Sequence, residues 1–136
     1  GYAQFKRLKE LVDRKRWIFK MYKEGLKDIP DLQVNEEPSH VYNSVWITGL
    51  VFGKSHNIIK KDAMPKLEEL GTPSRPFFYP LSSLPAFKNY LSKDFRSANK
   101  CSYDISNRGI NLPGALNLDS EQIRFIIKSI HTLLSQ

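Results

Sequence analysis

Residues 119–134 of the chain read D-S-E-Q-I-R-F-I-I-K-S-I-H-T-L-L, and this stretch is the clearest structural signal in the sequence. Asp119 is a preferred residue at a helix start, and Gln122 follows three positions later, as in a capping box. The apolar residues after them recur at helical spacing and form one stripe. They are Ile123, Ile126, Ile127, Ile130, Leu133 and Leu134. The stretch therefore predicts an amphipathic helix that packs one face against another layer of structure.

A second amphipathic helix is predicted at the other end of the chain, from residue 1 to about Leu26, and Pro30 cannot continue it. The helical pattern begins at residue 1 without a capping residue. This favours a piece of a longer polypeptide, and an ordinary or frayed chain end is the alternative. The apolar stripe consists of Phe5, Leu8, Val12, Phe19, Tyr22 and Leu26, widened by Leu11, Ile18 and Met21.

Strand and helix signals occupy the middle of the chain. Residues 41–52 are rich in β-branched and aromatic side chains and predict a strand. A helix is expected over residues 63–70, with Asp62 as its N-cap and Gly71 as its C-terminal cap. Pro65 would then lie in the first turn, where its missing N–H is tolerated.

The remaining segments are shorter. Residues 35–39 read as a polar loop, and the proline-rich residues 72–81 as a short strand plus loop or the rigid wall of a pocket. Short helices are expected over residues 85–91 and 97–106, followed by an extended segment over residues 110–113. This order predicts an α/β (α+β) two-layer sandwich, with a small mixed or antiparallel sheet covered by helices.

Composition limits the classes of function. The chain has 136 residues, the size of one domain, and no apolar stretch long enough to span a membrane. Cys101 is the single cysteine and the three histidines are isolated, so no metal-ligand spacing exists. Of the net charge of +7, residues 1–27 carry +6, from nine basic and three acidic residues. This basic face indicates a solvated surface or a partner surface rather than nucleic-acid binding.

One segment is a candidate binding site. Residues 75–81 place Arg75 beside Phe77, Phe78 and Tyr79, with prolines that stiffen the backbone. Arginine binds carboxylate or phosphate, and aromatic rings stack on sugars or bases. The combination suits an anionic, ring-containing ligand such as a nucleotide-sugar. The alternative is that the aromatic residues belong to the core and Arg75 pairs with an acid.

Two single residues also have alternative interpretations. Cys101 could be a nucleophile, although a lone cysteine is more often a small packing residue. His40 could act as an acid or base, or have a structural role. No P-loop, nucleophile elbow or dinucleotide-binding motif is present, so no self-contained active site is predicted and no catalytic residue is assigned in this chain.

Five stretches, in the same order, resemble the DegT–StrS family of vitamin B6-dependent nucleotide-sugar aminotransferases, and they cover essentially the whole chain. Residues 74–81 and 108–113 are similar to the family's "TRPxFYPl" and "RGinLP" segments, and this pair most resembles the perosamine synthases, which make a 4-amino sugar on a GDP carrier. The other three stretches are Gly1-Tyr2-Ala3-Gln4-Phe5, Asp13-Arg14-Lys15-Arg16 with Tyr22, and the last helix.

The resemblance implies that residues 1–136 are the C-terminal small domain of the aspartate-aminotransferase-like fold, with residues 1–27 as a basic helix that leads in from a large domain. In the family, the large domain carries the lysine that binds pyridoxal phosphate and most of the cofactor site. The chain alone is therefore expected to be inactive. The complete enzyme is expected to be a cytoplasmic homodimer, without nucleic-acid or membrane partners.

The implied reaction is ping-pong. Glutamate gives its amino group to the cofactor, and the amine then passes to a 4-keto-6-deoxyhexose on GDP or another nucleotide, for surface polysaccharide (O-antigen) synthesis. By the same resemblance, Arg75, Phe77, Phe78 and Tyr79 would face the nucleotide-sugar, and Asn111 would hydrogen-bond nearby.

Departures from the family pattern keep alternatives open. Ser82, which is included among the candidate substrate-binding residues, stands where relatives often carry histidine. Asn43 stands where they often carry tryptophan, and Pro65 is unusual in its helix. One alternative is a B6-dependent sugar dehydratase. The other is a non-catalytic interaction domain that docks an acidic partner through its basic helix, with Arg14, Lys15 and Arg16 as the contact residues.

Overall fold

A four-stranded sheet lies at the centre of the chain, in the computed structural model that describes residues 1–90 and 95–135. The strands are β1 (Leu32–Val34), β2 (Gly49–Phe52), β3 (Arg75–Pro76) and β4 (Gly109–Asn111). Their order is β1-β2-β4-β3, and every neighbouring pair is antiparallel. The expectation of a small mixed or antiparallel sheet is confirmed in its antiparallel form.

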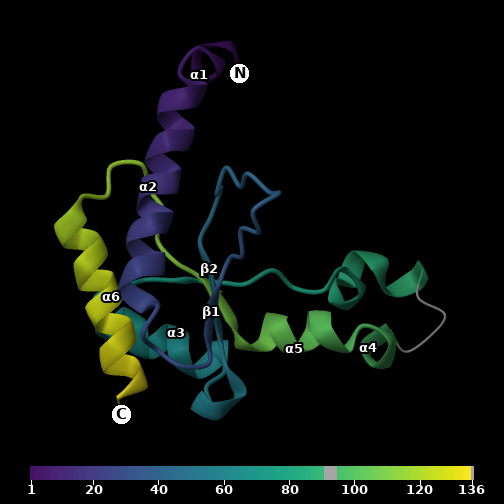
Figure 1. Cartoon of the computed structure of the whole chain (residues 1–136). Coiled ribbons are helices and arrows are strands. Elements are labelled where there is room, and N and C mark those ends of the chain that lie inside the picture. The colour runs from purple at the N-terminus through teal and green to yellow at the C-terminus, as the bar shows by residue number, and fades with distance from the viewer. Residues whose placement is uncertain (91–94, 136) are drawn as a thin grey trace.

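Three helices cover one face of this sheet: α2 (Leu8–Leu26), α3 (Lys60–Glu69) and α6 (Ser120–Leu134) (Figure 1). Their apolar residues form one buried cluster with the side chains of the sheet, which confirms the two-layer architecture. From the helices it contains Ile18, Tyr22, Leu26, Ala63, Leu67, Ile123, Ile126, Ile130 and Leu133; from β2 and β4 and the residue after it, Leu50, Phe52, Ile110 and Leu112.

Two predicted helix ends are confirmed, the start of α6 and the end of α3. The Asp119 carboxylate accepts a hydrogen bond from the Gln122 N–H, and the Gln122 side chain accepts one from the Asp119 N–H, which completes the capping box. At the end of α3, Gly71 adopts φ +74°. The N–H groups of Gly71 and Thr72 then close back on the carbonyls of Glu68 and Leu67, as in a Schellman motif.

The predicted strand over residues 41–52 is wrong in its first part, because only Gly49–Phe52 pairs in the sheet. Val45 has φ +52°, in the left-handed region that strands exclude. Its N–H bonds to the Asn43 side chain, and Lys15 and Arg16 of α2 donate to the carbonyls of Trp46 and Asn43. Residues 35–48 therefore form a loop. The short strand β1 was not predicted, because three residues are too few to show the alternation of apolar and polar side chains that marks a strand.

Two helix predictions also need correction. The first helix is interrupted after α1 (Tyr2–Phe5), so α2 begins only at Leu8. The expected N-cap Asp62 is wrong, because helix α3 begins at Lys60 with Ile59 as its N-cap and Asp62 lies inside the first turn. Pro65 therefore lies in the second turn rather than the first. Pro65 deprives the Lys61 carbonyl of its helical donor, and both residues are exposed, so water can replace that donor.

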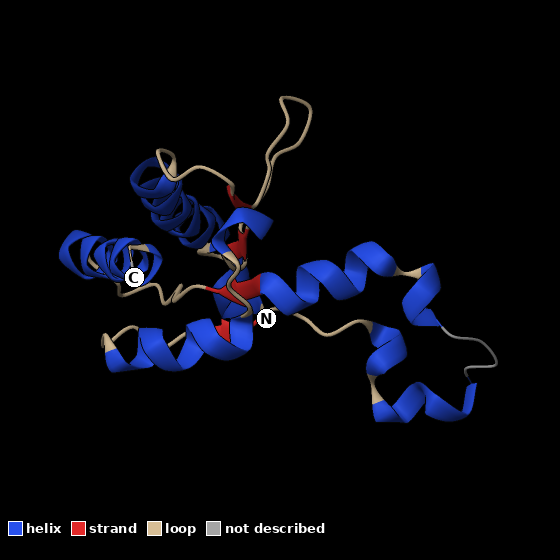
Figure 2. Ribbon diagram, turned by 90° about the horizontal axis from the view of Figure 1, so that it is seen from below, coloured by secondary structure: helices blue, strands red, loops and turns tan. Residues whose placement is uncertain are grey.

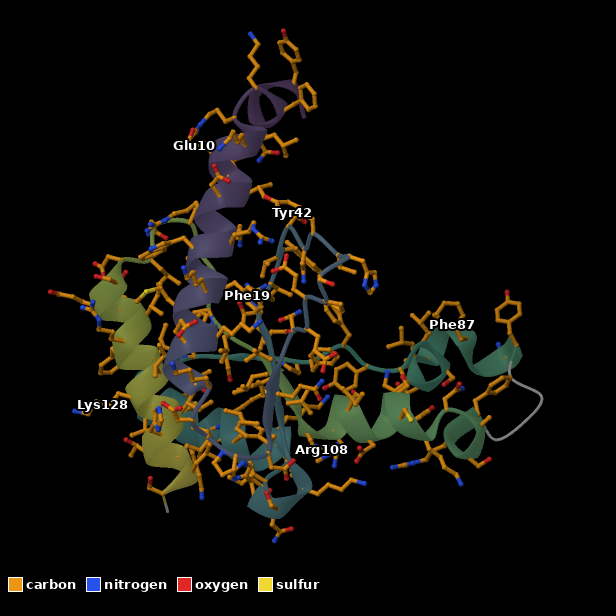
Figure 3. The ribbon with its side chains drawn as sticks, viewed as in Figure 1. Glu10, Phe19, Tyr42, Phe87, Arg108 and Lys128 are labelled. Atoms are coloured by element: carbon orange, nitrogen blue, oxygen red, sulfur yellow. The ribbon has the colours of Figure 1, made fainter. Side chains whose placement is uncertain are left out.

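Two segments project from the central layers (Figures 1 and 2). One is the 35–48 loop, with Tyr42 near its tip (Figure 3). The other, the arm, runs out from Phe77 and returns through α4 (Phe95–Ala98) and α5 (Lys100–Arg108); these two helices replace the single helix expected over residues 97–106. The outer part of the arm has 3₁₀ turns at Leu81–Ser83 and Pro85–Tyr90. The helix expected over residues 85–91 is therefore a 3₁₀ helix as far as Tyr90, and Leu91 lies outside the described residues.

Arg108 fastens the base of the arm to the sheet (Figure 3). Its guanidinium donates to both carboxylate oxygens of Asp104 and to the carbonyl of Phe52 at the end of β2. The hydrogen bonds to the Asp104 carboxylate hold the pKa of Arg108 above its usual value, and the Arg108 guanidinium holds the pKa of Asp104 below its usual value. The arm is therefore anchored at the strand that carries the core residues Leu50 and Phe52.

Candidate functional site

The register of the sheet brings Arg75 and Asn111 together on the face turned away from the helical layer. Gly49 of β2 pairs with Asn111 of β4, and Asn111 pairs with Arg75 of β3. Residues directly opposite each other in antiparallel strands share a face, and Leu50 and Ile110 occupy the core face, so these three point to the other side. Arg75 is exposed, and its side chain forms no hydrogen bond or ion pair within residues 1–90 and 95–135.

The side-chain NH₂ of Asn111 has a hydrogen-bond partner within the described residues, and its side-chain oxygen has none there. Its side-chain NH₂ donates to the Pro76 carbonyl at 3.0 Å. Its side-chain oxygen is buried and accepts no hydrogen bond from any residue that the structure describes, and the residue as a whole is 4% exposed. A buried acceptor without a donor is unfavourable, so this oxygen would gain from a ligand hydroxyl or N–H.

Phe77 packs across two glycines of the same face. A Cβ at Gly49 would lie 2.9 Å from the Phe77 ring, and a Cβ at Gly109 would lie 2.8 Å from the Phe77 Cβ. Only glycine leaves room for the ring at these two places. Phe77 is therefore partly structural, which agrees with the alternative that some aromatic residues of this segment belong to the packing of the domain.

Phe78 and Trp46 form an exposed aromatic pair next to Phe77. Their ring centroids lie 5.9 Å apart with the planes 26° from parallel, and Phe77 meets Phe78 edge-on at 5.8 Å. Phe78 is 54% exposed and Trp46 is 71% exposed. Trp46 comes from the 35–48 loop, so the aromatic surface is assembled from two segments that are distant in the sequence.

Tyr79 and Ser82 lie further along the arm and have different neighbours. The Lys60 ammonium lies 4.0 Å from the centre of the Tyr79 ring. Ser82 shares a hydrogen bond of 3.0 Å with the hydroxyl of Tyr103. The structure thus divides the six candidate residues into two neighbouring groups: Arg75, Phe77, Phe78 and Asn111 at the sheet, and Tyr79 and Ser82 on the arm.

The sequence analysis did not assign Lys60, Trp46 or Tyr103 to the site. Each is separated from residues 75–82 by at least 15 positions and is brought in only by tertiary folding. Of these three residues, only Trp46 had a feature in the sequence that could have pointed to the site, because it is an aromatic residue in a segment expected to be a strand. In the structure it is exposed.

The central basic residues of α2 are not a free partner surface. Arg14 donates to the carbonyls of Leu116 and Leu118, and Lys15 to those of Trp46 and Gly114. Arg16 pairs with Glu37 and donates to the Asn43 carbonyl. The expectation that these three side chains are solvated or bind an acidic partner is wrong, because they clamp the chain's own loops to α2.

Two other candidate groups, Cys101 and His40, are exposed. Neither side chain makes a hydrogen bond to any residue in the described part of the chain. Within the same residues, no group of three or more His, Cys, Asp or Glu side chains could hold a metal ion. No helix there is both long and apolar enough to cross a bilayer.

Comparison with known proteins identifies relatives along the whole chain. The DegT/DnrJ/EryC1/StrS aminotransferase family matches residues 1–131. GDP-perosamine synthase of Vibrio cholerae is 32% identical over 130 residues, which cover 96% of this chain and 34% of the relative. The chain thus spans about a third of the length of the curated relatives that it matches.

Solved structures share the fold. The PLP form of the putative sugar aminotransferase Spr1654 from Streptococcus pneumoniae superposes with a TM-score of 0.85 at 20% identity, over 99% of this chain and 34% of that one. DesI, solved with its TDP-sugar product, gives a TM-score of 0.85 at 19% identity, over 100% and 34%. The fold is that of the C-terminal domain of sugar aminotransferases with the aspartate-aminotransferase-like fold. Since the family match extends over nearly all of its residues, the chain belongs to the DegT/DnrJ/EryC1/StrS aminotransferase family.

Proposed function

We propose that this chain is the C-terminal small domain of a pyridoxal-phosphate-dependent nucleotide-sugar aminotransferase and contributes the binding surface for the nucleotide-sugar. The family match over residues 1–131 and the coverage of about a third of each curated relative support this division. The named activity of the Vibrio cholerae relative supports a GDP-linked sugar as substrate. We further propose glutamate as amino donor, a homodimer as the complete enzyme and surface polysaccharide as the product's destination.

The described residues do not by themselves fit pyridoxal phosphate. Bound in the family's enzymes, this cofactor supplies the electron sink for amino transfer. Its pyridine nitrogen needs an acidic partner. Lys60 is a partly buried lysine whose pKa is lowered by burial, but the pocket beside it is lined by no carboxylate. We therefore assign no cofactor contact and no reaction step through the cofactor to this chain, which is expected to be inactive alone.

The proposed binding of the nucleotide-sugar rests mainly on Arg75 and Asn111. Within the described residues, Arg75 is an exposed cation without a counter-charge, and the Asn111 oxygen beside it is a buried acceptor without a donor. Arg75 would bind an anionic group of the ligand, and Asn111 would accept a hydrogen bond from a hydroxyl or N–H. Phe78 and Trp46 would contact a sugar or base, and Tyr79 and Ser82 would line the path along the arm.

The test uses the complete enzyme that contains this chain. Arg75→Ala should raise the KM for the nucleotide-sugar about tenfold or more, because one hydrogen bond to a charged group is lost. The KM for glutamate should stay near its starting value. Arg124→Ala is the matched control, since Arg124 is exposed on α6 and its side chain makes no hydrogen bond or ion pair within the described residues. Unchanged KM and kcat for both substrates after Arg75→Ala would refute the assignment.

Product analysis of the same enzyme separates the two chemistries. A 4-amino sugar in the product supports the aminotransferase. A deoxygenated sugar without an added amino group would support the dehydratase alternative. The interaction-domain alternative has lost its proposed contact residues, because Arg14, Lys15 and Arg16 bond to the chain itself.

A further inference from the structure

A small polar pocket lies between the two limbs of the arm and the start of α3. It encloses about 220 Å³ and is lined by Lys60, Tyr79, Ser83, Arg96, Tyr103 and Ser106 together with Pro80 and Asn107. The outgoing limb supplies Tyr79 and Ser83, and α3 supplies Lys60. The returning helices supply Arg96 from α4 and Tyr103 and Ser106 from α5. Four separate segments therefore converge on one hollow.

The pocket is positively charged. Among residues 1–90 and 95–135, Lys60 and Arg96 line it and no aspartate or glutamate does. The Lys60 ammonium donates to the Ser106 hydroxyl at 3.3 Å and to the Phe77 carbonyl at 3.5 Å, both neutral acceptors, and burial lowers its pKa. A partly buried ammonium with neutral partners only is stabilised when an anion enters beside it.

Hydroxyl groups surround these cations. Tyr79, Ser83, Tyr103 and Ser106 are among the lining residues. Ser83 donates to the Pro80 carbonyl, Tyr103 shares a hydrogen bond with Ser82, and Ser106 accepts from Lys60, so an entering anion would compete with these local bonds. Hydroxyls donate to oxyanions, and a tetrahedral oxyanion can accept from several donors at once. The volume is below the roughly 300 Å³ at which pockets for drug-sized ligands begin, so it admits a single group rather than a whole nucleotide-sugar.

We propose that the pocket formed by Lys60, Arg96 and the hydroxyls of Tyr79, Tyr103, Ser83 and Ser106 binds a phosphate group. The pocket shares Tyr79 with the site proposed above but contains neither Arg75 nor Asn111, so the phosphate proposal is tested separately from that site. The group could be inorganic phosphate or the phosphate end of a nucleoside diphosphate. Both present the same tetrahedral oxyanion to the pocket.

The test titrates the chain with inorganic phosphate, GDP and guanosine at constant ionic strength and follows the backbone amide NMR signals of Ser83 and Ser106. Phosphate or GDP should shift these signals, and guanosine should not. A response to phosphate that GDP does not exceed identifies free phosphate as the ligand. Binding of GDP at least about tenfold tighter than phosphate identifies the diphosphate end. No shift with either anion up to about 10 mM, or an equal shift with guanosine, would overturn the proposal.

Charge-removing variants locate the site. Lys60→Met should weaken binding about tenfold, the effect of one hydrogen bond to a charged group, and Lys61→Met should change it less than about twofold. Lys61 is the matched control because it is the exposed neighbour of Lys60 on α3 and does not line the pocket. If Lys60→Met fails to fold, Arg96→Gln replaces it, since Arg96 is exposed and its loss should weaken binding similarly. Equal weakening by Lys61→Met would indicate unspecific attraction and overturn the proposal.

Discussion

The ammonium of Lys15 in α2 donates a hydrogen bond of 3.1 Å to the backbone carbonyl of Trp46 in the 35–48 loop, and a second to the carbonyl of Gly114. The indole of Trp46 in turn stacks on Phe78 of the arm. One side chain of the basic helix thus fixes the position of an aromatic wall of the candidate site. The positive charge of this helix is partly used inside the domain.

Replacing Lys15 with Met should loosen this loop while keeping the apolar stem of the side chain. Two carbonyls would lose a charged donor, so the free energy of unfolding should fall by about 1–3 kcal/mol. Urea denaturation measures this fall, and hydrogen exchange of residues 36–48 should become faster than in the wild type.

Lys20→Met is the control for Lys15→Met. Lys20 is exposed on the same helix, and its side chain makes no hydrogen bond or ion pair within residues 1–90 and 95–135. Its replacement should change the free energy of unfolding by less than about 0.5 kcal/mol. Equal exchange rates of the loop in Lys15→Met and wild type would show that Lys15 does not anchor it.

The pair Arg16–Glu37 should make the stability of the chain depend on pH. The Arg16 guanidinium and the Asn43 N–H both bond to the Glu37 carboxylate and lower its pKa. The unfolded chain then binds a proton to this group more readily than the folded chain does. The stabilisation is present above the ordinary glutamate pKa of about 4.3 and is lost as the pH falls through the lowered value of the folded state.

Urea midpoints measured between about pH 6 and pH 3 test this dependence. Asp31 and Asp104 have lowered pKa values as well, so the wild-type slope contains their contributions. The informative quantity is the difference between wild type and Glu37→Gln, whose stability should fall less steeply. Glu68→Gln, at an exposed position of α3, should keep the wild-type slope; parallel profiles for wild type and Glu37→Gln would contradict the prediction.

The N-cap of α6 should contribute measurably to stability. Asp119 accepts from the Gln122 N–H at 2.8 Å, and alanine removes this acceptor. Asp119→Ala should therefore lower the free energy of unfolding by about 1 kcal/mol, whereas Asp119→Asn, which keeps an acceptor oxygen, should cost much less. Thermal or urea denaturation of the two variants compares them directly, and equal losses would show that the cap does not act through this oxygen.

Elements with signals inside their own residues were predictable, namely the capped helix α6 and the glycine that ends α3. The 35–48 loop was not, because its path depends on Lys15 and Arg16, which lie some 20 to 30 positions earlier. Val45 illustrates the conflict: its β-branched side chain favours a strand, yet tertiary contacts hold it at positive φ.

The candidate site was predictable to a similar extent. Residues 75–79 showed their cation and aromatic residues directly in the sequence, and the sheet register then placed Asn111 beside Arg75. The partners Trp46 and Lys60 come from other elements, and no spacing rule links them to this segment.

The packing of Phe77 on Gly49 leads to a prediction about coupling between the two positions. A Cβ at Gly49 would lie 2.9 Å from the Phe77 ring, closer than real contacts allow, while the next atom, the Asn35 side-chain oxygen, would be 3.7 Å away. Gly49→Ala should therefore cost about 1–3 kcal/mol by displacing the ring.

In a Phe77→Leu background the same Gly49→Ala change should cost less, because the shorter side chain leaves room for the new methyl group. The double-mutant cycle, measured by urea denaturation, should give a coupling energy of about 0.5 kcal/mol or more. Gly114→Ala is the control, since its Cβ would come no closer than 3.6 Å to any neighbour and should be accommodated. Strict additivity of Gly49→Ala and Phe77→Leu would mean that the ring does not rest on Gly49, and the aromatic wall beside Arg75 would then need a different support.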